Sequence, residues 1–253
     1  MIIKNILITG ASSGIGEALA LHYAKQPSTE NIFICGRNGE RLEAVKQACQ
    51  KLSNAKIHSQ IIDITNKQAV EYWINDAEKT ASLNLVFANA GVATLEETPN
   101  NIFNTFNINV MGVINTILPT TEIYKKRKDT NKIIAITSSI AGYHGLASCP
   151  SYSASKACIK AYGEALRLDL LKYNIQVNTI CPGFVRSRIT DKNKCPMPFF
   201  MEAQPAAELI AKRIEKNVGL IAFPWPMRFA TWFLSILPNC VSDIIYKNLP
   251  HKV

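Results

Sequence analysis

The sequence contains no apolar run long enough to cross a bilayer and no CxxC pair. Its N-terminus runs from Lys4 straight into a short apolar stretch at 6–8, which is too short for a signal peptide and is followed by no cleavage site. The seven scattered cysteines are odd in number and predict neither a disulfide framework nor a zinc site, and the four histidines lack metal-ligand spacing. We therefore expect a metal-free protein of the reducing cytoplasm.

Acidic residues are comparatively few, with 19 Asp and Glu against 28 Lys and Arg, and the net charge is +9. Two interpretations stay open: a solvated basic surface, or attraction to an anionic partner such as a phosphate-bearing cofactor, an acidic substrate or a membrane face. The densest basic run, 125–128, falls at an expected helix end, where cations are favourable. No aromatic residues interleave with it, so no nucleic-acid site is predicted.

Short runs rich in Ile, Val and Leu alternate with amphipathic stretches along the chain. Such runs are typical of strands buried on both faces, and their alternation with helices predicts an α/β fold: a Rossmann-like, doubly wound parallel sheet of about seven strands with helices on both faces. The expected strands are 6–9, 32–35, 57–62, 83–88, 133–137, 177–181 and 220–223, and the expected helices are 14–25, 38–52, 66–79, 99–127, 151–173 and 205–216. No repeat or linker interrupts the pattern, so 1–253 is predicted to be one domain.

Two regions break this alternation. Residues 184–204 carry several prolines near two phenylalanines and are interpreted as a loop that covers a substrate pocket. Residues 224–250 form an apolar tail with aromatic residues at helical spacing. The tail has three possible roles: packing as core, forming an oligomer interface, or lying on a membrane surface, the last being less favoured because its first helical stretch holds a single cation, Arg228.

A glycine-rich turn follows the first strand and precedes the first helix. Glycines allow a tight turn at positive φ and let a pyrophosphate approach backbone N–H groups, while the helix N-terminus adds partial positive charge. The predicted phosphate cradle consists of Gly10, Ser12, Ser13, Gly14, Ile15 and Gly16.

The spacing TGxxxGxG in this turn resembles that of the short-chain dehydrogenase/reductase family. The second strand ends in Gly36-Arg37, and NAD-preferring members of that family carry Asp where Gly36 stands. A carboxylate would repel the 2′-phosphate of NADP, whereas a guanidinium binds it with two hydrogen bonds. We therefore predict NADP(H) as the cofactor. The alternative is that Arg37 is a solvated loop residue.

The resemblance implies further cofactor contacts at the ends of three strands. It implies that Asp63 accepts from the adenine amino group with the Ile64 backbone beside it. It also implies that Asn89, Ala90 and Gly91 form a turn against the cofactor, although Ala88 departs from the NNAG pattern of the family. After the sixth strand it places Pro182, Gly183 and Val185 against the nicotinamide, with Ser187 bonding the carboxamide.

Tyr152 and Lys156 are four residues apart on an expected helix and share one face. A nearby ammonium stabilises a phenolate, so we expect Lys156 to lower the pKa of Tyr152 and make it a general acid/base. The family places its catalytic serine 13 residues upstream of the tyrosine, at Ser139, with Ser138 the adjacent alternative. The resemblance further implies that Lys156 bonds the nicotinamide ribose, and that Asn109 helps hold a water in a proton relay to Lys156.

These motifs predict an NADP(H)-dependent oxidoreductase that interconverts a carbonyl and an alcohol on a hydrophobic small molecule. The expected pocket walls are Ile140, Tyr143, His144, Leu146, Phe184 and part of 196–201. The alternatives are a non-catalytic NADP-binding or regulatory protein and an epimerase or dehydratase of nucleotide sugars. The resemblance implies a homodimer or homotetramer formed through the helices expected at 99–127 and 151–173.

Overall fold

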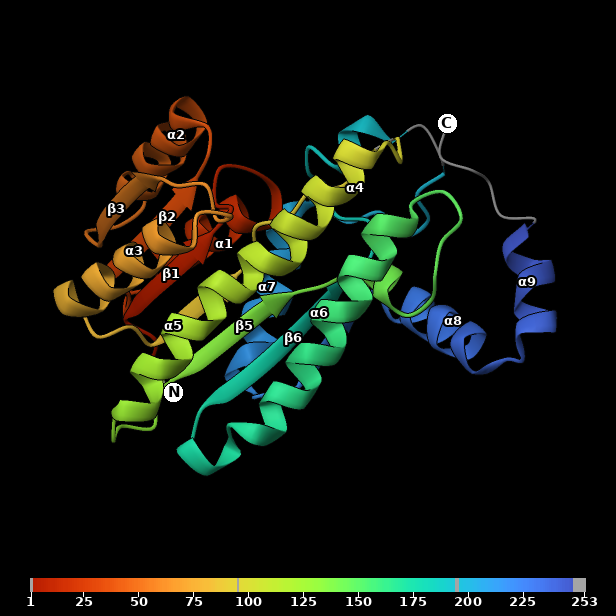
Figure 1. Cartoon of the computed structure of the whole chain (residues 1–253). Helices are drawn as coiled ribbons and strands as arrows, with labels where there is room; N and C mark the ends of the chain where they lie inside the picture. The colour runs from red at the N-terminus through yellow and green to blue at the C-terminus, as the bar shows by residue number, and fades with distance from the viewer. Residues whose placement is uncertain (1, 95, 194–195, 248–253) are drawn as a thin grey trace.

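The apolar runs form one parallel sheet with the strand order β3-β2-β1-β4-β5-β6-β7 (Figure 1). A computed structural model describes residues 2–94, 96–193 and 196–247. The strands are β1 Asn5–Thr9, β2 Asn31–Gly36, β3 Lys56–Ile61, β4 Leu85–Ala88, β5 Ile133–Thr137, β6 Gln176–Pro182 and β7 Leu220–Phe223. The predicted α/β, doubly wound fold is confirmed, with strand boundaries that differ from the expected ones by at most two residues.

Helices cover both faces of the sheet because successive strand residues point to opposite sides. In β1, Ile6 and Ile8 pack toward α1, α2 and α7, whereas Leu7 packs toward α3, α5 and α6. The helices are α1 Gly14–Ala24, α2 Gly39–Gln50, α3 Lys67–Thr80, α4 Pro99–Phe106, α5 Val113–Lys126, α6 Pro150–Asp169, α7 Ala203–Glu215, α8 Trp225–Ile236 and α9 Asn239–Lys247. Short helical turns lie at η1 Asn107–Gly112, η2 Ile140–Gly142, η3 Leu171–Tyr173 and η4 Thr190–Lys192.

The helix predicted at 99–127 is confirmed, since residues 99–126 are helical throughout, but it contains a π-helical turn. A π-helical turn, η1, separates α4 from α5. The turn holds Asn109, which is fully buried and whose side chain bonds the backbone of Val92 rather than its own helix. The wider π turn accommodates this inserted polar contact, and such turns are frequent at functional sites.

The predicted loop at 184–204 is closed at its base. Val185 and Met201 form an isolated parallel bridge, in which Arg186 N donates to Met201 O at 2.9 Å and Met201 N donates to Phe184 O at 2.9 Å. The first part of the loop turns toward the carboxyl ends of the strands, where Ser187 and Thr190 bond each other.

The tail predicted at 224–250 forms α8 and α9, while 248–250 lie outside the described residues. Its core-packing alternative is wrong for α8, none of whose side chains is buried. Figure 1 shows both helices projecting beyond α6, with α9 outermost. Within the described ranges, no helix combines the length and apolar character needed to cross a membrane.

The site region is positioned by the reversal of strand order at β1. The chain leaves β1 toward β2 and β3 on one side, and later returns to β4 on the other side. At such a switch point the connections from the two neighbouring strands diverge and leave a crevice at the carboxyl edge, where ligands bind in doubly wound sheets.

Burial in the central strand predicts a stability difference between two isoleucines. Ile6 in β1 is 0% exposed and Ile61 at the end of the edge strand β3 is 67% exposed. Ile6→Ala leaves a cavity between the helices and the sheet, so we expect it to lower the free energy of unfolding by about 2–5 kcal/mol in urea titrations. Ile61→Ala is the control and should change it by less than about 0.5 kcal/mol. Equal losses would contradict this packing.

Candidate active site

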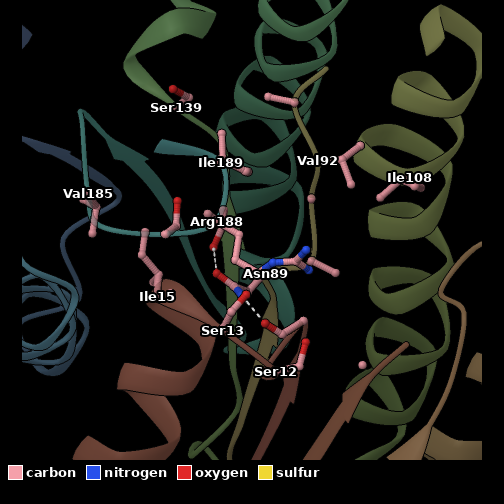
Figure 2. Close-up of a pocket in the computed structure, with 18 of the residues that line it drawn as sticks. Ser12, Ser13, Ile15, Asn89, Val92, Ile108, Ser139, Val185, Arg188 and Ile189 are labelled. Carbon is pink, nitrogen blue, oxygen red and sulfur yellow. Dashed lines mark hydrogen bonds between the residues drawn. The ribbon is translucent and has the colours of Figure 1, made fainter. Parts of the chain in front are cut away.

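A cavity of about 560 Å³ lies at the carboxyl edge of the sheet. Figure 2 shows its lining from several strand ends, with Ser12 and Ser13 at one end and Ser139 at the other. Among the predicted site residues, all line it except Gly16 and Asn109. The predicted residues that line the cavity are Gly10, Ser12, Ser13, Gly14, Ile15, Arg37, Asp63, Ile64, Asn89, Ala90, Gly91, Ser139, Tyr152, Lys156, Pro182, Gly183, Val185 and Ser187.

The glycine turn brings the first amides of α1 to the cavity. Gly10 and Gly14 have φ of 69° and 61°, a region that favours glycine. A Cβ on Gly16 would lie 2.3 Å from Gly10 O, so Gly16 permits the close packing of α1 on the turn without lining the cavity. The side chain of Ser13, which precedes α1, makes no capping hydrogen bond.

The starts of the next three helices are different. Asn38, Asn66 and Thr98 each accept a hydrogen bond from an amide in the first turn of α2, α3 and α4 respectively. At α1 the uncapped amides instead face the cavity and leave donors for a ligand. Uncapped amides at a helix N-terminus suit a phosphate group, so the residues present fit the pyrophosphate of a dinucleotide.

Asn89 links the ends of three strands. Its Nδ2 donates to Thr9 O at 3.1 Å, and its Oδ1 accepts from Thr137 Oγ1 at 3.2 Å. Its backbone N donates to Thr9 Oγ1 at 3.0 Å. These bonds hold the glycine turn after β1 and the end of β5 at a fixed separation around the cavity.

The rim beside β2 and β3 carries positive charge. Arg37 is exposed and lines the cavity together with Arg41 from the first turn of α2. The Nε of Arg41 is buried and has no hydrogen-bond partner within the protein, so this donor can serve an anion. Sequence reasoning missed Arg41, although its position four residues after Arg37 at the start of a helix was a usable signal.

Asp63 lies at the same rim. Its Oδ1 accepts from Thr65 N at 2.9 Å and from Thr65 Oγ1 at 2.8 Å. Asn66, rather than Asp63, caps α3. The aspartate therefore shapes the turn after β3 while still lining the cavity.

Tyr152 and Lys156 reach the cavity from the first half of α6. Lys156 Nζ donates to Thr137 O at the end of β5 at 3.0 Å, and it lies 5.9 Å from the centroid of the Tyr152 ring. Their helical spacing thus puts both groups on the cavity side of α6, as the sequence predicted.

The two serines after β5 have different partners. Ser138 Oγ donates to Lys156 O at 2.7 Å and anchors η2 to α6. Ser139 Oγ accepts from Ala141 N at 3.1 Å, and Ser139 is hydrogen-bonded to the phenol of Tyr152. Ser139 is therefore the serine whose hydroxyl meets Tyr152, whereas the hydroxyl of Ser138 is used to hold the helix.

Asn109 lies behind Gly91. Its Nδ2 donates to Val92 O at 2.9 Å and to Ser155 Oγ at 3.1 Å, and its Oδ1 accepts from Val92 N at 2.8 Å. A Cβ on Gly91 would lie 3.2 Å from both Asn109 Oδ1 and Lys156 Nζ, so these two atoms border the same small space. The side chain of Asn109 positions the Gly91–Val92 segment next to Lys156.

The turn after β6 closes the cavity opposite the strands. A Cβ on Gly14 would lie 2.9 Å from Ser187 Cβ, which brings this loop against the glycine turn. Thr190 and the exposed Arg188 also line the cavity, and Figure 2 shows Arg188 among the lining residues. Both were missed by sequence reasoning, because the motif was followed only to Ser187.

The predicted pocket walls differ from the cavity lining. The loop contributes Val185 and Ser187–Thr190 to the cavity, and not 196–201. The other expected walls, Ile140, Tyr143, His144, Leu146 and Phe184, do not line it either. Its apolar lining consists instead of Ile15, Ile62, Ile64, Ala90, Val92, Ala93, Ile108, Pro182, Val185 and Ile189. In the described part of the chain, no group of three or more His, Cys, Asp or Glu side chains lies together as metal ligands would.

Burial dominates the electrostatics of the tyrosine and lysine pair. It raises the pKa of Tyr152 to about 12, and the hydrogen bond with Ser139 opposes this rise. Burial also lowers the pKa of Lys156 to about 8. The expected lowering of the Tyr152 pKa is therefore wrong for the protein by itself, because both groups lose their hydration and Lys156 Nζ donates to Thr137. At neutral pH the phenol is protonated.

The lowered pKa of Lys156 predicts a pH-dependent stability. Between about pH 8 and its ordinary pKa of 10.5, the folded protein binds fewer protons at this site than the unfolded chain, so stability rises with pH. Urea titrations at pH 7, 8, 9 and 10 should show the wild type gaining stability relative to Lys156→Met above pH 8. The comparison cancels groups common to both proteins, and a constant difference across this range would contradict the lowered pKa.

Comparisons with known proteins agree with the geometry. Residues 4–196 match the family described as short chain dehydrogenase. An uncharacterized oxidoreductase of Myxococcus xanthus is 34% identical over 252 residues, which cover 97% of this chain and 97% of the relative. A 3-oxoacyl-[acyl-carrier-protein] reductase of Rickettsia prowazekii is 34% identical over 237 residues, covering 92% of this chain and 89% of the relative.

Solved structures share the fold. A short chain dehydrogenase/reductase from Burkholderia phymatum in complex with NAD has a TM-score of 0.81 at 22% identity, covering 100% of this chain and 98% of that one. A short-chain dehydrogenase from Sphingobium yanoikuyae in complex with NADPH has a TM-score of 0.80 at 19% identity, covering 98% and 97%. The chain belongs to the short-chain dehydrogenase/reductase family and is an oxidoreductase that acts on CH–OH and C=O groups.

Proposed function

We propose that the protein is an NADP(H)-dependent reductase of apolar carbonyl compounds. The observation that carries this proposal is the shared cavity: Ser139, Tyr152 and Lys156 line the same space as the uncapped start of α1. A pyrophosphate bound at those amides would direct the rest of the dinucleotide along the strand ends toward Tyr152.

The protonated phenol suits the reductive direction. The reduced nicotinamide, when bound, supplies the hydride. Tyr152 donates its proton to the oxygen of the reacting carbonyl, and Ser139 donates a hydrogen bond that stabilises charge on that oxygen. Lys156, held by Thr137 O, provides positive charge beside the phenol, and Asn109 holds the segment that borders Lys156.

Charge at the cavity supports NADP over NAD. Its lining contains four cationic residues, Arg37, Arg41, Lys156 and Arg188, and one acidic residue, Asp63. Gly36 offers no carboxylate at the end of β2, and the buried Nε of Arg41 requires an acceptor. A 2′-phosphate placed between Arg37 and Arg41 would supply it.

The partners proposed are small carbonyl and alcohol substrates and a second copy of the chain, in a homodimer or homotetramer of the cytoplasm. Each copy is proposed to be one catalytic domain, with the 184–204 loop covering substrate. A 3-oxoacyl-[acyl-carrier-protein] reductase among the relatives supports carbonyl reduction. A non-catalytic NADP-binding protein is less well supported, since binding alone gives no reason for Ser139 and Tyr152 to be hydrogen-bonded at the cavity.

Removing the phenol separates catalysis from binding. Tyr152→Phe should lower NADPH turnover with a ketone panel by about 10²- to 10⁴-fold, because the proton donor is lost. NADPH binding, followed by nicotinamide fluorescence, should persist. Ser139→Ala should likewise lose turnover, while Ser138→Ala keeps most of it and loses about 1 kcal/mol of stability. Wild-type turnover in Tyr152→Phe would remove this residue from the mechanism.

The cofactor preference depends on the guanidinium at the rim. Arg37→Ala should weaken NADPH binding by about tenfold to a hundredfold and leave NADH binding nearly unchanged, because only NADPH carries the 2′-phosphate. Dissociation constants of both cofactors measure this. Arg186→Ala is the matched control, since Arg186 does not line the cavity and pairs with Glu202 at 2.7 Å. Equal weakening of both cofactors would exclude Arg37 as the discriminating residue.

A further inference from the structure

The solvent-facing side of α8 is apolar. Trp225 is 77% exposed and Phe229 is 58% exposed, and they continue through Trp232, Phe233 and Ile236 in one helical stripe. The rings of Phe229 and Phe233 stack with centroids 6.2 Å apart. A surface helix of a protein surrounded by water carries polar residues on this side, so α8 departs from the usual pattern.

The opposite side of α8 contacts the protein. Met227, Thr231 and Leu234 are only partly exposed and follow helical spacing, and α8 packs against β7 and η2. The residues of the exposed stripe therefore take no part in the contacts that hold α8 in place. On α9, Val241, Ile244 and Ile245 are also exposed, and we call the exposed apolar residues of the two helices together the α8–α9 face.

The α8–α9 face adjoins the cavity. Gly183 lines the cavity, and a Cβ on Gly183 would lie 3.2 Å from Met227 Sδ and 3.3 Å from Ile140 Cδ1. Met227 belongs to α8, so the inner side of α8 packs behind Gly183 in the wall of the site, and the exposed aromatic stripe is on the other side of the same helix. Whatever binds the stripe is held at the edge of the active site.

The charge of this region favours an anionic surface as the occupant. No acidic residue occurs between Glu215 and Asp243, and 216–253 hold four Lys and Arg against one Asp. The whole chain has a net charge of +9. Tryptophan, phenylalanine and leucine flanked by cations are typical of helices that lie in the plane of a membrane interface.

We propose that the α8–α9 face docks the protein on an anionic lipid surface, and that apolar carbonyl compounds dissolved in the lipid enter the cavity beside α8. The second part rests on the proposed function. A second copy of the chain is the competing occupant. It is less favoured because like charges such as Arg228 would approach each other, and because a copy seated there would stand at the edge of the site instead of delivering substrate.

Tryptophan fluorescence and flotation test the docking. Two of the three tryptophans, Trp225 and Trp232, are exposed on α8, whereas Trp73 is 3% exposed in the core. Adding vesicles of phosphatidylcholine with phosphatidylglycerol to the full chain should shift the emission to shorter wavelength and float the protein. Vesicles of phosphatidylcholine alone should bind less, because they lack the anionic charge.

The variant Phe229→Ser/Phe233→Ser should partition into anionic vesicles about tenfold less or weaker still, because it removes two aromatic side chains from the interface. The control Leu52→Ser/Tyr72→Ser removes two exposed apolar side chains elsewhere and should bind as the wild type does. Absence of vesicle binding by the wild type, or equal binding by Phe229→Ser/Phe233→Ser, overturns the proposal. So does a fall in oligomer mass in the variant with vesicle binding unchanged, which assigns the face to a second copy.

Activity separates this proposal from the proposed function. NADPH oxidation with a water-soluble ketone, without vesicles, should be the same in the wild type and in Phe229→Ser/Phe233→Ser. With a long-chain ketone dissolved in the vesicles, the variant should be slower by the factor lost in partitioning. No oxidation by the wild type in either assay contradicts the proposed function alone. Equal rates of the wild type and the variant on the long-chain ketone dissolved in vesicles contradict lipid delivery.

Discussion

The geometry of the site depends on the hydrogen bonds made by the side chain of Asn89. From the end of β4 it bonds Thr9 O at the end of β1 and Thr137 Oγ1 at the end of β5. Thr137 O in turn accepts from Lys156 Nζ on α6. A continuous set of hydrogen bonds therefore runs from the glycine turn through three strand ends to α6. Because parallel strands end at one edge of the sheet, a single amide can set the distance between a dinucleotide cradle and a phenol.

Two kinds of electrostatic environment meet in this cavity. At the rim, Arg37, Arg41 and Arg188 line the cavity with positive charge. In the interior, Lys156 is buried and Tyr152 is half-buried. Loss of hydration favours the neutral form of each group, so it lowers the pKa of Lys156 to about 8 and raises the pKa of Tyr152 to about 12. At neutral pH the phenol of Tyr152 is therefore protonated, and it lies beside the amine of Lys156, whose pKa of about 8 is close to neutral.

The sequence predicted the sheet, the order of its motifs and most of the residues that meet at the cavity, because these follow from local signals: apolar runs, a glycine turn, and side chains four residues apart on a helix. It did not predict the π turn at η1, since Asn109 is held by a bond to Val92, distant in the chain. Arg188 was missed because an exposed arginine in a loop carries no periodic signal, and Arg41 was missed because its position four residues after Arg37 was not used. The exposure of α8 was equally hidden, as apolar spacing alone does not distinguish a face packed on the core from one that is exposed.

A structure of the protein with NADP⁺ bound tests the central claim most directly. The account predicts the pyrophosphate at the amides of Gly14 and Ile15, the 2′-phosphate between Arg37 and Arg41, and the nicotinamide beside Tyr152 and Pro182. C4 of the ring would then face a space that a carbonyl carbon can occupy about 3–3.5 Å away, within hydrogen-bond reach of the Tyr152 phenol. A nicotinamide lying away from Tyr152, or a pyrophosphate that makes no contact with the start of α1, would contradict it.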